Sequence, residues 1–254
     1  MTFIERSWEL EERNWWDLWN SSFRSEDNRD EVSSELFAHV LGLIREITCG
    51  LGCRVLEVAC GTGTLSRSLP FSSYHGLDLS AAAIEIARQK AGSVALAPGA
   101  SEPSYEAADF HDWLLPAEPF DLVMCIDAIS CFRDQALVMK KIAQSVRPGG
   151  HVLITTINPF VYNRIRRADG GRLQNGPVSL WLSRRELNEL FQQASLTVDR
   201  SYTIMPRGNI GILRLVNSWR LNRMLGSRGA AAYRRWKENV GLGQYRVMLA
   251  RKAS

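Results

Sequence analysis

The stretch Arg54-Val55-Leu56-Glu57-Val58-Ala59-Cys60-Gly61-Thr62-Gly63-Thr64 is a nearly continuous apolar run that ends in a glycine-containing turn. Residues 65–69 then have the pattern of a helix start. A buried parallel strand is typically a run of Val, Ile and Leu. Glycine lets the backbone turn sharply and approach a ligand at the N-terminus of the next helix. The stretch therefore predicts a small-molecule-binding loop on a doubly wound α/β sheet.

The spacing of the glycines argues against a dinucleotide ligand. A dinucleotide fingerprint has glycine at its first, third and sixth positions, but Gly61 and Gly63 are followed by Ser66 at the sixth. Glu57, at the end of the predicted strand, is poorly placed for an anionic pyrophosphate. Its carboxylate suits a ligand that carries an ammonium and a sulfonium, so we expect a cofactor that is cationic at this end.

These residues together resemble the acid-x-Gly-x-Gly-x-Gly motif of the class I methyltransferases, which bind S-adenosylmethionine. Ala59 stands where the first glycine is usual, a small steric change that is compatible with binding. The resemblance implies a class I methyltransferase enzyme with a Rossmann-like, seven-stranded doubly wound sheet. It also implies S-adenosylmethionine as the cofactor and S-adenosylhomocysteine as the product. Four ordered landmarks carry it over residues 53–157.

Two further predicted strands end in acids. Asp78 closes the strand that begins at Ser73, and an acid at this point hydrogen-bonds ribose hydroxyls; its alternative role, capping the helix over residues 81–90, suits Ser80 better. The strand over residues 104–108 ends in Asp109, which the resemblance assigns to the adenine amino group, a donor that a carboxylate can accept. A fourth strand is predicted over residues 120–126. The expected cofactor-binding residues are Glu57, Ala59, Gly61, Gly63, Asp78, Leu79, Asp109, Phe110 and Ile126.

The rest of the chain is expected to extend this core. A helix capped by Ser33 or Ser34 is expected before the first strand. The patterns also predict a helix over 135–146, an Arg-Pro-Gly-Gly turn over 147–150 and a strand over 151–157. A helix over 183–194, with a capping box formed by Ser183 and Glu186, and strands over 196–204 and 244–251 follow. The expected parts are an N-terminal helical cap (1–50), the cofactor-binding core (51–204), a helical insertion that acts as a substrate lid (205–243) and the final strand (244–254).

The N-terminal segment and the insertion are the candidate acceptor-binding regions. Trp16 and Trp19 lie at helical spacing in a segment that holds half of the eight tryptophans, and they either pack on the core or close over the cofactor. In the insertion, one helical face is formed by Ile212, Leu215, Val216 and Trp219, but Leu221, Met224 and Leu225 fall elsewhere on the helical wheel. This pattern predicts two or more helices, with arginines beside the apolar residues. The expected acceptor-contacting residues are Trp16, Trp19, Asn158, Arg214, Trp219 and Arg220.

Methyl transfer depends mainly on positioning and desolvation, with a base needed only to unmask a hydroxyl or amine. Asp127, at the tip of the fourth strand, is the best-placed candidate base, although it could instead cap the following turn. His111 is the second candidate and lies on the adenine side. The segment Ile126-Asp127-Ala128-Ile129 lacks the Pro-Pro-aromatic motif of base-methylating nucleic-acid enzymes, so we expect an oxygen of a small or lipid-linked acceptor.

Charge divides the chain into two halves. Residues 1–159 hold 13 Lys and Arg against 22 Asp and Glu, a net charge of −9, whereas residues 160–254 hold 18 against 5, a net charge of +13. The basic half suits an anionic acceptor, an anionic membrane surface or nucleic acid, or is a solvated surface. A ribose- or tRNA-directed RNA methyltransferase and a non-catalytic cofactor-binding scaffold therefore stay open as alternatives.

Composition sets further bounds. The 254 residues, 45% of them hydrophobic, can bury a substantial core, and the N-terminus lacks the layout of a signal peptide, so a cytoplasmic location is expected. The five cysteines favour reduced thiols over disulfides. No second pair of cysteines or histidines lies at the spacing that a zinc site requires, so no metal is expected. The sequence leaves open a monomer or a homodimer.

Overall fold

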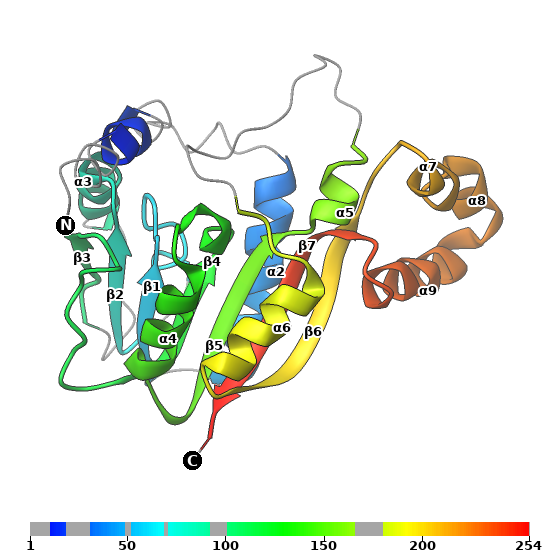
Figure 1. The fold of residues 1–254 in the computed structure, drawn as a ribbon. Coiled ribbons are helices and arrows are strands. Elements are labelled where there is room, and N and C mark those ends of the chain that lie inside the picture. The colour runs from blue at the N-terminus through cyan, green and yellow to red at the C-terminus, as the bar shows by residue number, and fades with distance from the viewer. Residues whose placement is uncertain are drawn as a thin grey trace.

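The computed structural model describes residues 11–18, 31–48, 52–68, 71–91, 101–165 and 180–253. Their centre is a seven-stranded sheet in the order β3-β2-β1-β4-β5-β7-β6, in which β7 runs antiparallel to both of its neighbours (Figure 1). This confirms the expected α/β fold. The strands are β1 (Arg54–Val58), β2 (Ser73–Asp78), β3 (Ser104–Ala107), β4 (Phe120–Ile126), β5 (Val146–Ile157), β6 (Leu196–Pro206) and β7 (Gly243–Lys252).

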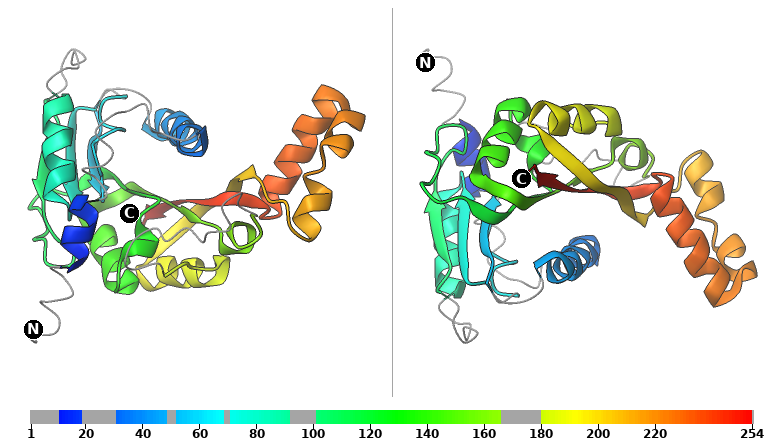
Figure 2. Two further views of the ribbon diagram at one scale, coloured as in Figure 1. Left: turned by 90° about the horizontal axis from the view of Figure 1, so that it is seen from above. Right: turned by 90° about the horizontal axis from the view of Figure 1, so that it is seen from below.

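Helices cover both faces of the sheet because successive strand residues point to opposite sides. Val55 belongs to the cluster under α2 (Glu31–Thr48) and α3 (Ala81–Ala91), whereas Leu56 belongs to the cluster under α4 (Gln135–Ser145) and α6 (Arg184–Gln193). The two views in Figure 2 show α2 and α4 on opposite sides of the sheet. Both faces of β1 and β4 are therefore buried away from solvent, which explains their continuous apolar sequences.

Two predicted helix caps are present. The Ser183 hydroxyl accepts a hydrogen bond from the Glu186 amide at 3.3 Å, and the Glu186 carboxylate accepts one from the Ser183 amide at 2.7 Å, which confirms the capping box of α6. Ser80 caps α3, because its hydroxyl accepts a hydrogen bond from the Ala83 amide at 3.1 Å. These caps fix where each helix begins relative to the preceding segment.

Three local predictions are wrong. Residues 61–68 form turns instead of a helix from Leu65, since the side chains of Ser66 and Arg67 bond the Gly63 carbonyl at 2.7 and 3.0 Å and compete with helical bonding. The helix α2 begins at Glu31, before either serine proposed as its cap. The Arg-Pro-Gly-Gly segment belongs to β5 as a bulge, because the register with β4 shifts between Phe120 and Leu122.

The insertion forms three helices, α7 (Ile212–Val216), α8 (Trp219–Met224) and α9 (Gly226–Asn239), which lie beyond β6 at the edge of the sheet (Figure 1). Two or more helices were expected, but the continuous face from Ile212 to Trp219 does not form, because the chain leaves the helix at Asn217. Leu213 is the buried residue of α7 instead. The short elements η2 (Ile129–Cys131) and α5 (Pro159–Tyr162) follow β4 and β5. No described helix combines the length and the apolar character that crossing a membrane requires.

Candidate active site

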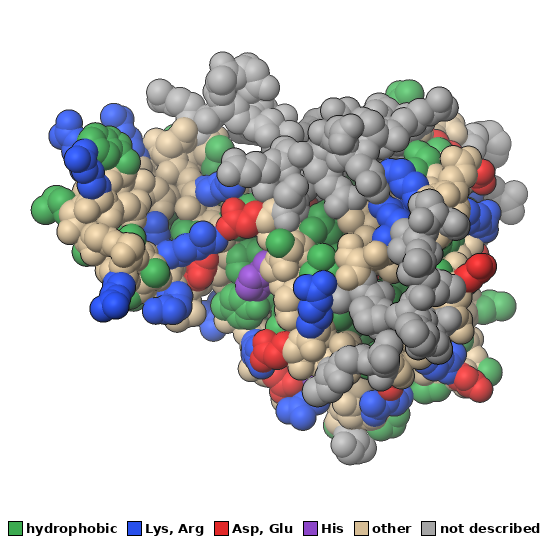
Figure 3. Space-filling model, turned by 180° about the vertical axis from the view of Figure 1, so that it is seen from behind, with side chains coloured by type: hydrophobic (Ala, Val, Ile, Leu, Met, Phe, Trp, Pro, Cys, Tyr) green, Lys and Arg blue, Asp and Glu red, His purple; other side chains and the backbone are tan. Residues whose placement is uncertain are grey.

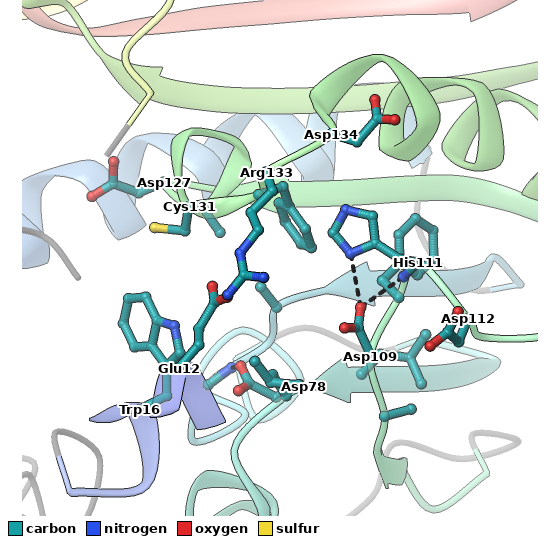
Figure 4. A pocket seen from close by; sticks show the side chains of 18 of the residues that line it. Glu12, Trp16, Asp78, Asp109, His111, Asp112, Asp127, Cys131, Arg133 and Asp134 are labelled. Atoms are coloured by element: carbon teal, nitrogen blue, oxygen red, sulfur yellow. Dashed lines mark hydrogen bonds and ion pairs between the residues drawn. The ribbon is translucent and has the colours of Figure 1, made fainter. Parts of the chain in front are cut away.

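A cavity of about 890 Å³ lies at the carboxyl edge of the parallel strands. Its wall combines the loops that follow β1, β2, β3 and β4 with the helix of residues 11–18 (Figure 4). In open α/β sheets, ligands bind outside the carboxyl ends of the strands, so this is the expected place for a cofactor. The lining residues are Glu12, Trp16, Ala59, Gly61, Leu77, Asp78, Leu79, Ala108, Asp109, Phe110, His111, Asp112, Ile126, Asp127, Ala128, Cys131, Phe132, Arg133 and Asp134.

Asp78 joins the glycine loop to the end of β2. Its carboxylate accepts hydrogen bonds from the Gly61 amide at 2.7 Å and from the Ser80 amide at 2.9 Å. Burial raises the pKa of Asp78 and the two amide hydrogen bonds oppose that rise. The side chain is thereby held in one orientation at the cavity wall, where it can accept hydrogen bonds from a ligand.

The backbone of the loop explains its residue types. Ala59, Gly61 and Gly63 all have positive φ, at 59°, 54° and 67°. A Cβ atom on Gly61 would meet no atom within 4 Å, whereas one on Gly63 would lie 2.8 Å from the Tyr105 hydroxyl oxygen. Gly61 is therefore open toward the cavity and Gly63 is packed against the core. Ala59 holds the left-handed conformation that glycine would adopt without steric cost.

Asp109 and His111 form a pair on the loop after β3. Oδ1 of Asp109 accepts hydrogen bonds from the amide and from Nδ1 of His111, both at 2.8 Å. Burial alone would raise the pKa of Asp109, but these hydrogen bonds lower it, and the same carboxylate raises the pKa of His111. The pair places a charged carboxylate at the cavity, and its second oxygen is not used by His111 (Figure 4).

At the tip of β4, Asp127 lines the part of the cavity wall that follows this strand. Its backbone is left-handed, with φ of 56°, and its amide donates to the carbonyl oxygen and the hydroxyl of Thr155 at 3.0 and 2.9 Å. Cys131 lies close by, and burial followed by the charge of Asp127 raises the pKa of its thiol to about 12. Cys131 is therefore a neutral thiol near pH 7 rather than a nucleophile.

The helix of residues 11–18 spans the cavity between two anchors. Asp17 accepts hydrogen bonds from the Ser80 hydroxyl at 2.7 Å and from the Ala82 amide at 3.1 Å, at the start of α3. Glu12, five residues earlier, forms an ion pair with Arg133 at 2.7 Å. Trp16 lies between these anchors and lines the cavity (Figure 4). The helix therefore links the β2 side of the cavity to the β4 side.

Glu57 lies behind the wall rather than in it. It is buried and accepts a hydrogen bond from the Tyr74 hydroxyl. Burial, opposed by that hydrogen bond and reinforced by the charge of Asp78, raises the pKa of Glu57 to about 8. Near pH 7 this carboxyl holds its proton, so the negative charge at the cavity comes from other acids.

Most residues predicted for the cofactor reach the cavity. Ala59, Gly61, Asp78, Leu79, Asp109, Phe110 and Ile126 line it, and so do Asp127, His111 and Trp16. The structure does not bring Glu57 or Gly63 to the wall. Asn158 is buried and holds the start of β7, donating to the Gly241 and Gly243 carbonyls at 2.9 and 2.8 Å. Arg214, Trp219 and Arg220 lie on the insertion and do not line the cavity, and Trp19 is outside the described residues.

Sequence reasoning missed Glu12 and Arg133. Glu12 precedes Trp16 by four residues, so helical periodicity places both on one face and could have identified it. Arg133 and Asp134 follow η2 after the tip of β4, where topology alone marks a candidate position. The direction of these two side chains depends on the 3-10 turn η2, which no sequence motif predicted.

The comparisons with known proteins agree with this geometry. A family model described as a methyltransferase domain matches residues 22–201, more than half of the chain. A ubiquinone biosynthesis O-methyltransferase of Aromatoleum aromaticum is 36% identical over 110 residues, which cover 42% of this chain and 45% of that protein. A phthiotriol/phenolphthiotriol dimycocerosates methyltransferase of Mycobacterium ulcerans is 31% identical over 141 residues, covering 54% and 48%. The chain spans about half the length of the curated relatives it matches.

A solved structure shows the same fold along nearly the whole chain. The magnesium protoporphyrin IX methyltransferase of Synechocystis PCC 6803, solved with bound S-adenosylmethionine, superposes with a TM-score of 0.61 at 11% identity, covering 96% of this chain and 97% of that one. At this identity the likeness establishes the fold alone. With the family match, the strand order and the cavity at the carboxyl edge of the sheet, the chain belongs to the class I S-adenosylmethionine-dependent methyltransferases.

Proposed function

We propose that this protein transfers a methyl group from S-adenosylmethionine to an oxygen atom of a small or lipid-linked acceptor. The observation that carries the proposal is the carboxylate of Asp78, fixed by the Gly61 and Ser80 amides in the wall of the cavity. A carboxylate held in this way accepts from both hydroxyls of a ribose without further ordering of the side chain.

The charge of the cavity fits this cofactor. Six acids line it, against one arginine and one histidine, so a cationic ligand is favoured and a pyrophosphate is disfavoured. The acids are Glu12, Asp78, Asp109, Asp112, Asp127 and Asp134. Oδ2 of Asp109 can accept from the adenine amino group, and Leu79, Phe110 and Ile126 supply apolar surface for the ring. The bound cofactor supplies an activated methyl group.

The acceptor end of the cavity lies at the tip of β4. Asp127 is held there by two bonds to Thr155 and can take the proton of an acceptor hydroxyl. Trp16 and Phe132 flank the same space and exclude water from it. The similar protein from Aromatoleum aromaticum is an O-methyltransferase of ubiquinone biosynthesis, which supports oxygen as the acceptor atom and a small or lipid-linked acceptor.

Calorimetry with S-adenosylmethionine tests the cofactor assignment. We expect Asp78→Ala to weaken binding by about 1–3 kcal/mol, because ribose hydroxyls would lose a charged acceptor. Asp112→Ala is the matched control, since Asp112 also lines the cavity but its carboxylate is not held by a backbone amide as that of Asp78 is, as far as the described residues show; it should change the affinity much less. Equal losses in both variants, or unchanged affinity in Asp78→Ala with an unchanged melting temperature, would contradict the assignment of Asp78.

Turnover tests the reaction separately. Label from methyl-labelled S-adenosylmethionine should enter an organic-soluble fraction of small molecules and lipids rather than tRNA, and Asp127→Asn should lower the rate by roughly 10²-fold or more while cofactor affinity stays the same. Asparagine tolerates the left-handed backbone at this position, so the loop should keep its shape. Label in tRNA would favour an RNA methyltransferase. Cofactor binding without transfer to either fraction would favour a non-catalytic protein.

A further inference from the structure

The insertion of residues 207–242 is a folded unit that projects from the edge of the sheet (Figure 2). Leu213 is fully buried, and the Lys237 ammonium, also buried, donates to Asn217 Oδ1 at 3.1 Å. The Thr203 hydroxyl on β6 donates to the Glu238 carbonyl at 2.6 Å. These contacts hold α9 on β6 and tie the end of α7 to α9, and α8 packs against α9, so the side chains on the outer surface of the unit have defined positions.

That outer surface is unusually apolar for an exposed unit. Six large hydrophobic side chains of the insertion are between 49% and 85% exposed, and they occur within 29 consecutive residues. Isolated exposed hydrophobic residues need no explanation, but a concentration of them marks an interaction surface. The six are Ile212, Leu215, Trp219, Met224, Trp236 and Val240.

The same surface is strongly basic. The insertion holds seven arginines and one lysine against a single acid, Glu238, which is already in an ion pair with Arg234 at 2.9 Å. On α8 the two kinds of side chain alternate, since Trp219 and Arg223 are one turn apart and so are Arg220 and Met224. Figure 3 shows Lys and Arg side chains interspersed with hydrophobic ones over this end of the molecule.

We propose that the exposed surface of α7, α8 and α9 docks on a membrane that contains anionic phospholipids. Surface-bound helices combine arginines, which contact lipid phosphates, with Trp, Leu and Met side chains that enter the headgroup and acyl boundary. RNA would use the arginines, but it offers no apolar medium for Ile212, Leu215 or Met224. The surface is separate from the cavity, because the lining of the cavity includes no residue of the insertion. Docking therefore does not depend on which acceptor is methylated.

Vesicle co-sedimentation of the full chain tests the proposal. We expect binding to vesicles with about one-third phosphatidylglycerol, weak or no binding to pure phosphatidylcholine, and a loss of binding as salt is raised. Arg220→Gln with Arg223→Gln, and separately Trp219→Ser with Met224→Ser, should each weaken binding at least about tenfold. Leu114→Ser is the matched control, because Leu114 is 86% exposed but lies between β3 and β4; it should bind as the unchanged protein does.

All five substituted side chains are exposed, so melting temperatures should stay within a few degrees and a folding defect can be recognised. Absence of binding to phosphatidylglycerol vesicles at low salt would overturn the proposal. Saturable tRNA binding that needs Arg220 and Arg223 but not Trp219 and Met224, without vesicle binding, would overturn it in favour of an RNA contact. Equal loss of vesicle binding in Leu114→Ser would overturn the assignment of the surface.

Discussion

The cavity and the insertion are opposite in charge and in construction. Six acids line the cavity, and its loops are tied to strand ends by short hydrogen bonds such as that from Gly61 to Asp78. The insertion is basic, and it contacts β6 through α9, where the Glu238 carbonyl accepts a hydrogen bond from the Thr203 hydroxyl. The charge asymmetry of the sequence thus corresponds to two separate places in the fold. One suits a cationic cofactor, and we propose that the other faces an anionic surface.

The sharpest test of this difference is a pair of glycine substitutions. Gly63 and Gly226 both have a positive φ, of 67° and 62°, so alanine brings a left-handed strain of about 1 kcal/mol at each. At Gly63 the added Cβ also lies 2.8 Å from Tyr105 and 3.1 Å from Ala87, whereas at Gly226, at the start of α9, it meets nothing within 4 Å. We expect Gly63→Ala to lower the free energy of unfolding by about 2–4 kcal/mol and Gly226→Ala by about 1 kcal/mol.

Urea denaturation of both variants measures the two losses. A difference near zero would mean that the loop after β1 relaxes as readily as the insertion does, which would break the proposed contrast in packing. Gly63→Ala should also weaken S-adenosylmethionine binding, because its loop carries Gly61, while Gly226→Ala should leave that affinity unchanged.

The core of the fold was predictable from the sequence because local patterns and global topology agree there. The apolar run of β4, the β-branched run of β5 and the glycine turn after β1 each have one dominant interpretation. Residues 61–68 were not predictable, because bonds from Ser66 and Arg67 to nearby carbonyls compete with helix formation. The break of the insertion at Asn217 depends likewise on how Leu213 packs, which no periodicity contains.

The pH dependence of stability provides a second test on the acidic side of the molecule. With a pKa of about 8 in the folded state and 4.5 as its ordinary value, Glu57 keeps its proton on folding while the unfolded chain loses it. The free energy of unfolding therefore falls as pH rises between these values, by up to about 1.4 kcal/mol per pH unit. Glu57→Gln removes this contribution, so the variant should gain up to about 1.4 kcal/mol relative to the unchanged protein between pH 6 and pH 7.

Tyr74→Phe distinguishes the cause of this behaviour. The Tyr74 hydroxyl opposes the effect of burial on the pKa of Glu57, so its removal should extend the fall in stability to higher pH. A constant difference between Glu57→Gln and the unchanged protein across this pH range would show that Glu57 is charged in the folded state. It could then attract a cationic cofactor, as the sequence alone indicates.

Site residues were predictable to the extent that strand ends determine them. Asp78 ends β2, Asp109 and Asp127 follow β3 and β4, and the carboxyl ends of parallel strands meet at one edge. Glu57 is also near a strand end, but it shares a face with Val55 and points toward the core under α2 and α3. In a sheet that is buried on both sides, the alternation of side chains along a strand does not show which face lies next to a ligand. The position of the Glu57 side chain was therefore known only from the structure.

The smallest expected effect concerns the helix of residues 11–18, which we propose opens and closes over the cavity. It has two anchors, and in the one at Glu12 and Arg133 the Arg133 side chain is 39% exposed and the Glu12 side chain 13% exposed, so its loss should cost on the order of 1 kcal/mol. We expect Arg133→Gln to leave global stability nearly unchanged while amide hydrogen exchange in residues 11–18 becomes about two- to fivefold faster. Adding S-adenosylhomocysteine should slow that exchange in the unchanged protein and slow it less in the variant.

Arg185→Gln is the control for this experiment, because it removes an exposed ion pair with Glu189 at 3.6 Å on α6, away from the cavity. It should not alter exchange in residues 11–18. The second anchor, at Asp17, predicts which part of the helix opens first. Since Asp17 stays bonded to Ser80 and Ala82, the Glu12 end should exchange faster than the Asp17 end in Arg133→Gln. Uniform acceleration along the helix would mean that it unfolds or leaves as a unit. If neither Arg133→Gln nor the added S-adenosylhomocysteine changes the exchange rate, the helix stays packed over the cavity permanently. The ligand would then have to enter the cavity by another route.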